Sequence, residues 1–185
     1  MEENKKKKIS TKDMVQIAMF TAVVAVLSRI AIPMPSGVPV TLQTLAVALC
    51  GYVLGSKKGA VSLLVYALLG AVGAPVFANF KGGLGAIAGP TGGFIWGFIF
   101  MAFLCGLGIE SKHKWLAVVL GIAGVLVCHA CGAAQFAIIK GNGFWSSALL
   151  VSVPYLVKDF LSVIIALGAA ALIRSRIKVT AAANQ

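Results

Sequence analysis

Six long apolar runs, separated by short polar or Gly- and Pro-containing breaks, constrain the fold of this chain more than any other feature. Of its 185 residues, 59% are hydrophobic and 11% are charged, whereas soluble domains carry about 25% charged residues. A membrane-spanning helix needs about 20 mainly apolar residues. Six or seven crossings therefore fill the chain, and we expect a single all-α polytopic membrane domain.

The breaks in the apolar pattern predict six transmembrane helices. Prolines, glycines or pairs of basic residues end each run, because Pro and Gly interrupt helices. The predicted helices cover residues 14–32, 40–55, 60–73, 93–109, 115–139 and 147–173. Residues 1–13 form a basic N-terminal segment and residues 174–185 form a tail, so the six-helix bundle occupies residues 14–173.

The distribution of Lys and Arg predicts how the helices are oriented. With the N-terminus in the cytoplasm, two basic residues fall in the outer loops, Lys81 and Lys140, and twelve fall on the inner side. Cytoplasmic loops carry such an excess. We therefore expect a multi-pass protein of the plasma membrane with both termini in the cytoplasm. The net charge of +11 then indicates contact with anionic membrane lipids and not with nucleic acid. The inner set is Lys5, Lys6, Lys7, Lys8, Lys12, Lys57, Lys58, Lys112, Lys114, Arg174, Arg176 and Lys178.

Residues 74–93 (APVFANFKGGLGAIAGPTGG) lie between the third and fourth predicted helices. Pro75, Pro90 and the many glycines exclude a membrane helix here. In hydrocarbon each unsatisfied backbone group costs several kcal/mol, so a non-helical segment at membrane depth must lie against protein, solvent or a ligand. The predicted orientation places this stretch outside. We expect a Gly-rich extracellular loop that covers a binding site.

Polar side chains within the predicted helices concentrate in their outer halves, which predicts a cup open to the outside. A carboxylate together with an amide suits a neutral ligand group that bears both N–H and C=O. A Lys or the backbone N–H groups of the Gly-rich loop would hold an anionic end, and aromatic residues would surround an apolar body. The alternative is a structural network in which Lys158 neutralises Asp159. The candidate substrate-binding residues are Asp159, Asn79, Gln43, Phe77, Lys81, Gly83, Gly93, Tyr155 and Lys158.

The sequence lacks the motifs of the common catalytic sites. Residues 83–91 are Gly-rich but have no Lys in the position that a phosphate-binding loop requires, and no serine-hydrolase or zinc-protease motif is present. The segment CHAC at 128–131 has no second cluster to complete a metal site, so we interpret its small residues as packing. We expect neither an enzyme, nor a bound metal, nor a cofactor.

Four segments of the chain resemble a known family. They are PVTLQT at 39–44, LGSKKG at 54–59, GAVGAPVF at 70–77 and GPTGGF at 89–94. In these, and over nearly its whole length, the chain is similar to the biotin-specific S component of energy-coupling-factor (ECF) transporters, the BioY family. The resemblance implies a membrane subunit that captures biotin from outside and works with a transmembrane coupling subunit and two cytoplasmic ATPases. It also implies that the ureido ring bonds to Asp159 and Asn79.

Two further features bear on this resemblance. The family often shows Gly-Asp-x-x-Lys in the last helix, whereas here Lys158 directly precedes Asp159. Successive residues of a helix point about 100° apart, so a Lys directly before the Asp is turned away from it. Lys81 and the backbone amides of the Gly-rich loop are therefore alternatives to Lys158 for binding the ligand carboxylate. Ala18 and Ala22 form a small-x-x-x-small pair on which a coupling subunit would dock. The alternative for this pair is packing within the chain.

Two other functions fit the same pattern of residues. One is an S component for a different water-soluble vitamin, which only ligand competition distinguishes from a biotin protein. The other is a membrane scaffold that transports nothing, in which the polar residues serve packing alone.

Overall fold

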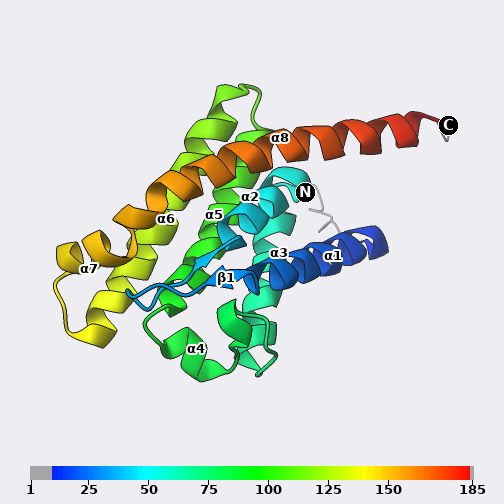
Figure 1. The fold of residues 1–185 in the computed structure, drawn as a ribbon. Helices are drawn as coiled ribbons and strands as arrows, with labels where there is room; N and C mark the ends of the chain where they lie inside the picture. Colours follow the sequence, from blue (N-terminus) through cyan, green and yellow to red (C-terminus); the bar gives the residue numbers. More distant parts are fainter. Residues whose placement is uncertain (1–9, 184–185) are drawn as a thin grey trace, which may run out of the picture.

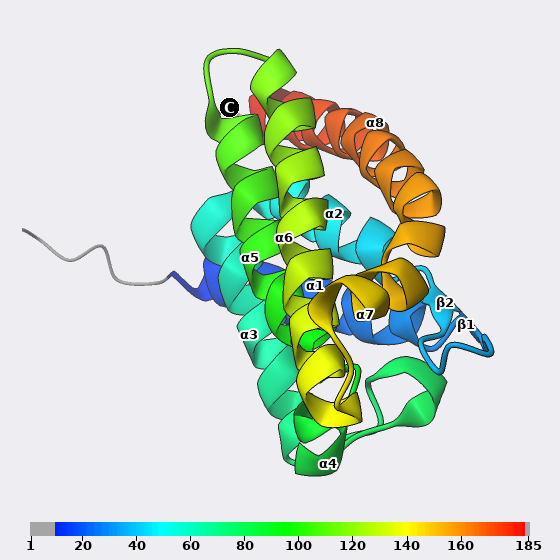
Figure 2. The same ribbon diagram turned by 90° about the vertical axis from the view of Figure 1, so that its left-hand side faces the viewer.

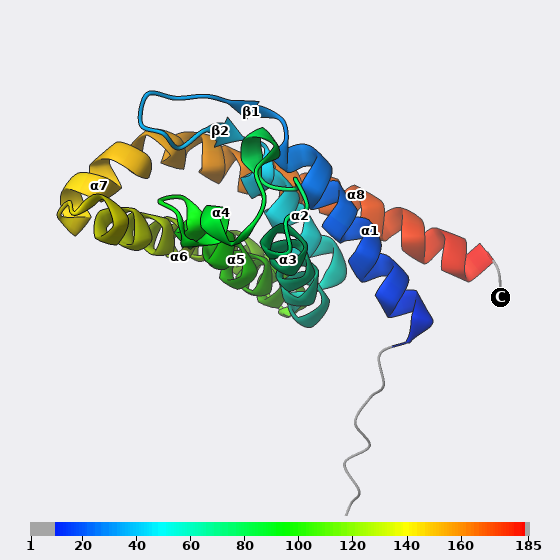
Figure 3. The same cartoon turned by 90° about the horizontal axis from the view of Figure 1, so that it is seen from below.

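Helix α2 (Gln43–Leu54) lies at the centre of a helical bundle (Figure 1). The structure is a computed structural model that describes residues 10–183, with side chains to residue 176. Five longer helices contact α2, and most of its side chains are buried. Figure 3 shows α6, α5 and α3 in one row, with α8 and α1 on the other side of α2. The five helices are α1 (Thr11–Ser28), α3 (Ser56–Ala71), α5 (Gly92–Glu110), α6 (Trp115–Lys140) and α8 (Val153–Ala183).

The short elements gather at one end of the bundle, and the α5–α6 turn lies at the other (Figure 2). Strands β1 (Ala31–Ile32) and β2 (Val40–Thr41) pair antiparallel, with Ala31 opposite Thr41. The Gly-rich stretch of residues 74–93 contains a 3-10 turn, η1, and one short helix, α4. These elements therefore lie together at the end where the outer loops are predicted. Their bounds are Ala78–Phe80 for η1, Leu84–Ala88 for α4 and Phe144–Val151 for the helix α7 that precedes α8.

Glycines allow the central helices to approach closely. A Cβ atom at Gly97 of α5 would lie 2.7 Å from the Cα atom of Cys128 on α6, and one at Gly106 would overlap the backbone of Ser56 on α3. Small residues at helix contacts let the backbones of membrane helices pack directly against each other. The α3–α5–α6 row is held by this packing.

Polar contacts join the helix ends at the end opposite to the β-strands. Glu110 of α5 accepts hydrogen bonds from the backbone N–H of Ser56, at 2.9 Å, and from its hydroxyl, at 2.7 Å. The carboxylate thus satisfies an otherwise free N–H at the start of α3. Arg174 of α8 donates to the carbonyl of Tyr52 at 2.9 Å, and Lys58 pairs with Asp13 of α1 at 3.0 Å. These contacts bring basic segments that are predicted to be cytoplasmic to one end of the molecule.

The predicted helices correspond to α1, α2, α3, α5, α6 and the α7–α8 pair, which confirms an all-helical fold. Within residues 10–183, four helices are long and apolar enough to cross a membrane: α1, α5, α6 and residues 153–176 of α8. Helix α2 has 12 residues and α3 has 16. The exact number of crossings stays a prediction.

The ends of the first helix differ from the prediction of residues 14–32. Helix α1 begins at Thr11, because the Ser10 side chain accepts from the backbone N–H of Asp13 and the Asp13 carboxylate accepts from that of Ser10. This reciprocal capping fixes the start of a helix. The helix ends at Ser28, so that residues 31–32 are free to pair with β2.

The last predicted helix, 147–173, is divided at Ser152 into α7 and α8. Ser152 has φ −124° and ψ −58°. Pro154 explains the break, because a proline has no N–H to donate to the carbonyl of Leu150 four residues earlier and its ring clashes with that carbonyl in a continuous helix. Helix α8 also continues to Ala183, so residues 174–183 of the predicted tail are helical.

Candidate functional site

A cavity lies between α2, α5, α6 and α8, beside the Gly-rich stretch of residues 74–93. It measures about 860 Å³, including space open to solvent. Such a combination of apolar walls and a few convergent polar groups is typical of small-molecule sites. The polar lining residues are Thr41, Gln43, Thr44, Asn79, Lys81, Thr91, His129, Tyr155, Lys158 and Asp159; the larger apolar ones are Val38, Phe77, Phe94, Ile95, Phe98, Met101, Val125 and Val151.

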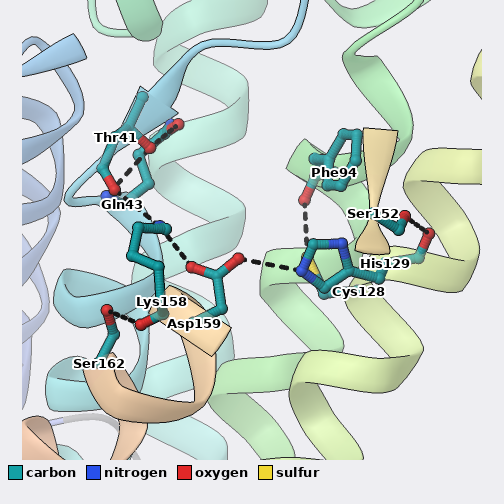
Figure 4. A network of polar contacts seen from close by, with 9 residues as sticks. All are labelled: Thr41, Gln43, Phe94, Cys128, His129, Ser152, Lys158, Asp159 and Ser162. Carbon is teal, nitrogen blue, oxygen red and sulfur yellow. Dashed lines mark hydrogen bonds and ion pairs between the residues drawn. The ribbon is translucent and has the colours of Figure 1, made fainter. Parts of the chain in front are cut away.

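Asp159 of α8 is the one carboxylate among the residues that line the cavity, and it is 4% exposed. Its Oδ1 atom forms an ion pair with the ammonium of Lys158, and its Oδ2 atom lies 3.0 Å from His129 Nε2 on α6 (Figure 4). A buried charge requires partners of this kind. The network therefore joins α6 and α8 across the cavity and holds Asp159 in place.

Lys158 contributes to this network, although the helical turn of about 100° per residue predicts that it points away from Asp159. Its Nζ atom donates to the carbonyl of Thr41 at 3.0 Å and contacts Asp159 Oδ1. The long, flexible stem of a lysine places its charge far from the direction of its Cβ atom. The two side chains therefore pair, as the alternative of a structural network expected, and both line the cavity.

The amide of Gln43 lines the cavity but is already hydrogen-bonded within the protein. Its Nε2 atom donates to the Tyr66 hydroxyl at 2.8 Å, and its Oε1 atom accepts from the Thr41 hydroxyl at 3.2 Å. The Tyr66 hydroxyl donates in turn to the carbonyl of Val76 at 3.1 Å, and its ring packs edge-on against Phe77 at 5.4 Å. Gln43 thus holds Tyr66, and the Tyr66 ring in turn positions Phe77 at the cavity wall.

Asn79 and Lys81 present their polar groups from the Gly-rich stretch. Asn79 and Phe80 have φ angles of 57° and 58°, a left-handed geometry that Asn adopts more readily than most residues. The Phe80 ring lies 5.3 Å from the guanidinium carbon of Arg29. Among the described residues, no group hydrogen-bonds to the side chain of Asn79 or pairs with Lys81. Both remain available to a ligand in the cavity.

Gln135 of α6 anchors the Gly-rich stretch. Its Nε2 atom donates to the carbonyl of Ile87 at 2.7 Å and to that of Gly89 at 2.8 Å. Both carbonyls lie at the end of α4, and the carbonyl of Gly89 also accepts from the backbone N–H of Gly92 at 3.0 Å. The contact therefore fixes α4 beside the cavity.

Replacing Gln135 by Leu removes both hydrogen bonds, with an expected loss of local stability of about 1–3 kcal/mol. We expect the amide hydrogens of Ala86 and Gly92, which bond within this stretch, to exchange at least about tenfold faster. Hydrogen-exchange mass spectrometry measures this rate. Gln16→Leu is the matched control, because Gln16 accepts from Lys58 at the other end of the bundle. Equal exchange in Gln135→Leu and the unaltered chain would refute the anchor.

Tyr155 of α8 bonds to the loop between β1 and β2. Its hydroxyl donates to the carbonyl of Val38 at 2.6 Å and lies 2.7 Å from the Ser36 hydroxyl. Tyr155, Val38 and Val151 belong to one buried apolar cluster. This contact joins the β1–β2 loop to α8 beside the cavity, which both Val38 and Tyr155 line.

The structure brings seven of the nine candidate substrate-binding residues to one cavity: Asp159, Asn79, Gln43, Phe77, Lys81, Tyr155 and Lys158. Gly83 and Gly93 do not line it. Gly83 has φ +88° and donates its N–H to the carbonyl of Gly70 at 2.6 Å. Gly93 lies in α5 against the backbone of Cys131. Both glycines therefore serve chain geometry and helix packing.

Sequence reasoning missed the role of His129. It lies in the CHAC segment at 128–131, whose small residues were interpreted as packing, yet it meets Asp159, which is 30 residues away in sequence. Helix periodicity places a residue on a face but does not say which helix that face meets. A histidine within an apolar helix was itself the usable signal, because ionisable residues at membrane depth are commonly functional.

Ala18 and Ala22 are exposed on α1. The helix packs on α2 and α3 through a different face, which carries Ile17, Phe20 and Val24. Packing within the chain, the alternative for this alanine pair, is therefore not observed.

Comparison with known proteins agrees with this geometry. The model of the BioY family matches residues 3–179. The chain is 44% identical over 122 residues to the biotin transporter BioY of Thermotoga maritima, covering 65% of this chain and 72% of that protein. It is 37% identical over 151 residues to the probable biotin transporter BioY of Pyrococcus horikoshii, covering 82% and 89% of the two chains.

The fold is similar to the crystal structure of the S-component for biotin from an ECF-type ABC transporter. The TM-score is 0.78 and the sequence identity is 25%, over 89% of this chain and 91% of that one. The family model spans nearly the whole sequence, and the fold agrees with it. The chain belongs to the BioY family.

Proposed function

We propose that this protein is the biotin-binding S component of an ECF transporter and captures biotin from outside the cell. The observation that carries the proposal is the buried Asp159 carboxylate, which faces a cavity beside the Gly-rich stretch in a chain of the BioY family. The protein is a membrane transporter subunit and not an enzyme.

The ureido ring of biotin fits the polar groups around Asp159. A ureido group carries two N–H donors and one carbonyl acceptor. Asp159, as a carboxylate, accepts from an N–H, and the uncommitted amide of Asn79 donates to the carbonyl. Hydrogen bonds with an ionised partner are stronger than neutral ones. This pairing places the ureido ring at the α6–α8 network.

The two lysines of the cavity take different roles in this arrangement. Lys158 pairs with Asp159 and donates to the carbonyl of Thr41. These contacts favour a position of the Lys158 ammonium beside the ureido end of biotin. Lys81 has no carboxylate partner among the described residues and is the better cation for the biotin carboxylate. Phe77, Phe94 and Ile95 supply apolar walls for the sulfur-containing ring and the aliphatic chain.

Energy for transport comes from other subunits, because the chain has no nucleotide-binding motif. We propose a transmembrane coupling subunit and two cytoplasmic ATPases as partners. The exposed Ala18–Ala22 face of α1 fits a closely approaching helix of the coupling subunit. The basic ends of the helices favour a cytoplasmic position for both termini, and contacts with anionic lipid would add to this preference.

Binding of radiolabelled biotin to the purified protein tests this proposal. We expect saturable binding that unlabelled biotin displaces and that riboflavin and thiamine do not. Biotin at about 100 times its dissociation constant adds about 2.7 kcal/mol to the stability of the folded protein, so biotin also raises the melting temperature. Equal displacement by another vitamin would favour an S component for that vitamin. The absence of stabilisation by any water-soluble vitamin would favour a scaffold.

A further inference from the structure

His129 carries its proton on a defined nitrogen. Its Nε2 atom lies 3.0 Å from Asp159 Oδ2, and both side chains are more than nine-tenths buried. A carboxylate only accepts hydrogen bonds, so Nε2 is the donor. In a neutral imidazole the other nitrogen, Nδ1, is then an acceptor.

The Nδ1 atom of His129 is buried and finds no hydrogen-bond partner among the described residues. It lies on the side of the ring away from Asp159 (Figure 4), and His129 lines the cavity. Buried polar atoms without a partner are uncommon, and a missing ligand is one explanation. The Phe94 ring, edge-on at 5.6 Å, packs against the imidazole and restrains its orientation.

Both carboxylate oxygens of Asp159 already have a partner within the protein, because Lys158 contacts Oδ1 and His129 contacts Oδ2. Part of the hydrogen-bonding capacity of Asp159 is therefore used without a ligand. A ureido ligand brings two N–H donors, and Asp159 with His129 Nδ1 provides two kinds of acceptor for them. We propose that His129 is a ligand-binding residue whose neutral Nδ1 atom accepts a ureido N–H. This inference rests on the proposed function of biotin binding.

Ligand and proton compete for Nδ1 in this arrangement, so affinity falls as His129 becomes protonated. The other titratable groups that line the cavity with His129 are Tyr155, Lys158 and Asp159 on α8, Cys128 on α6, and Lys81 of the Gly-rich stretch. Helices α2, α5 and α7 contribute no charged side chain to the cavity lining. Of these types of group, an imidazole is the one that ordinarily changes its charge between about pH 5 and pH 8.

The test measures biotin affinity of the purified full chain from about pH 8 to about pH 5 for three proteins. In the unaltered chain we expect affinity to fall at the acid end, by up to about tenfold per pH unit. His129→Gln keeps an amide N–H for Asp159 but has no titratable nitrogen. We expect it to bind about tenfold more weakly at pH 8, as for one lost hydrogen bond, with affinity constant over the range.

His113→Gln is the matched control, because His113 is the second of the two histidines in the chain and is exposed on the α5–α6 turn. It should keep the affinity and the pH profile of the unaltered chain. A constant affinity of the unaltered chain across the range would overturn the inference, whether or not His129→Gln folds.

Two other results would also overturn it. One is wild-type affinity in His129→Gln. The other is weaker binding by His129→Gln with an unchanged pH profile, which would make His129 only a support for Asp159. An absence of saturable biotin binding to the unaltered chain at every pH would instead refute the proposed function, and the inference with it.

Discussion

Asp159→Asn lowers the affinity for biotin by about 100-fold, equivalent to about 3 kcal/mol. The carboxylate is the acceptor proposed for a ureido N–H, and it balances the charge of Lys158. An asparagine at this position is neutral and turns an N–H₂ group toward either Lys158 or His129. The variant therefore loses a charge-assisted hydrogen bond to the ligand and leaves a cation without its partner inside the cavity. Equilibrium binding of radiolabelled biotin measures the loss.

Asp13→Asn provides the matched control for this prediction. Asp13 is the other aspartate of the chain, and it pairs with Lys58 at the opposite end of the bundle. Its side chain is 34% exposed, so its removal has a small effect on stability. We expect unchanged biotin affinity in this variant. Wild-type affinity in Asp159→Asn, with a folded protein, would remove Asp159 from the site.

Tryptophans at Ala18 and Ala22 together reduce biotin uptake at least about tenfold without weakening biotin binding. Small residues allow two helices to approach closely, and large side chains on the same face hold the partner helix away. No residue of α1 lines the cavity, so we expect the affinity for biotin to be unchanged. Uptake is measured in cells that contain the coupling subunit and the ATPases, and affinity is measured on the purified variant.

Met19→Trp is the control for bulk on α1. Met19 is 53% exposed and lies about 100° around the helix from Ala18. We expect normal uptake in this variant. Equal loss of uptake in Met19→Trp and in the double variant would show that the alanine face is not specific. Normal uptake in the double variant would exclude docking through this face.

The helical architecture was predictable because hydropathy and helix breakers act locally. Five of the six long apolar runs each became one helix and the last became α7 and α8. The limits of 92–110 and 115–140 for α5 and α6 lie within a residue of the prediction. The break at Ser152 was also predictable in principle, because Pro154 cannot donate the helical hydrogen bond to the residue four positions before it. The sequence pattern did not predict β1 and β2, since two-residue strands carry little periodicity.

The cavity was predictable only in part, because its residues meet over long sequence distances. Asp159, Asn79 and Lys81 could be named from the chemistry of an outer polar cup and from resemblance to the family. The pairing of Asp159 with His129 depends on how α6 faces α8, and no local pattern encodes this contact. Gly83 and Gly93 do not line the cavity, since a glycine near a site can serve packing or a positive φ angle as well as ligand contact.

A structure of the purified protein with biotin bound decides whether Asp159 holds the ureido ring. We expect the ureido ring within hydrogen-bond distance of Asp159 and Asn79, in the cavity beside residues 74–93, and the biotin carboxylate near Lys81. Biotin bound elsewhere, or bound in this cavity with its ureido ring away from Asp159, would refute the proposed site.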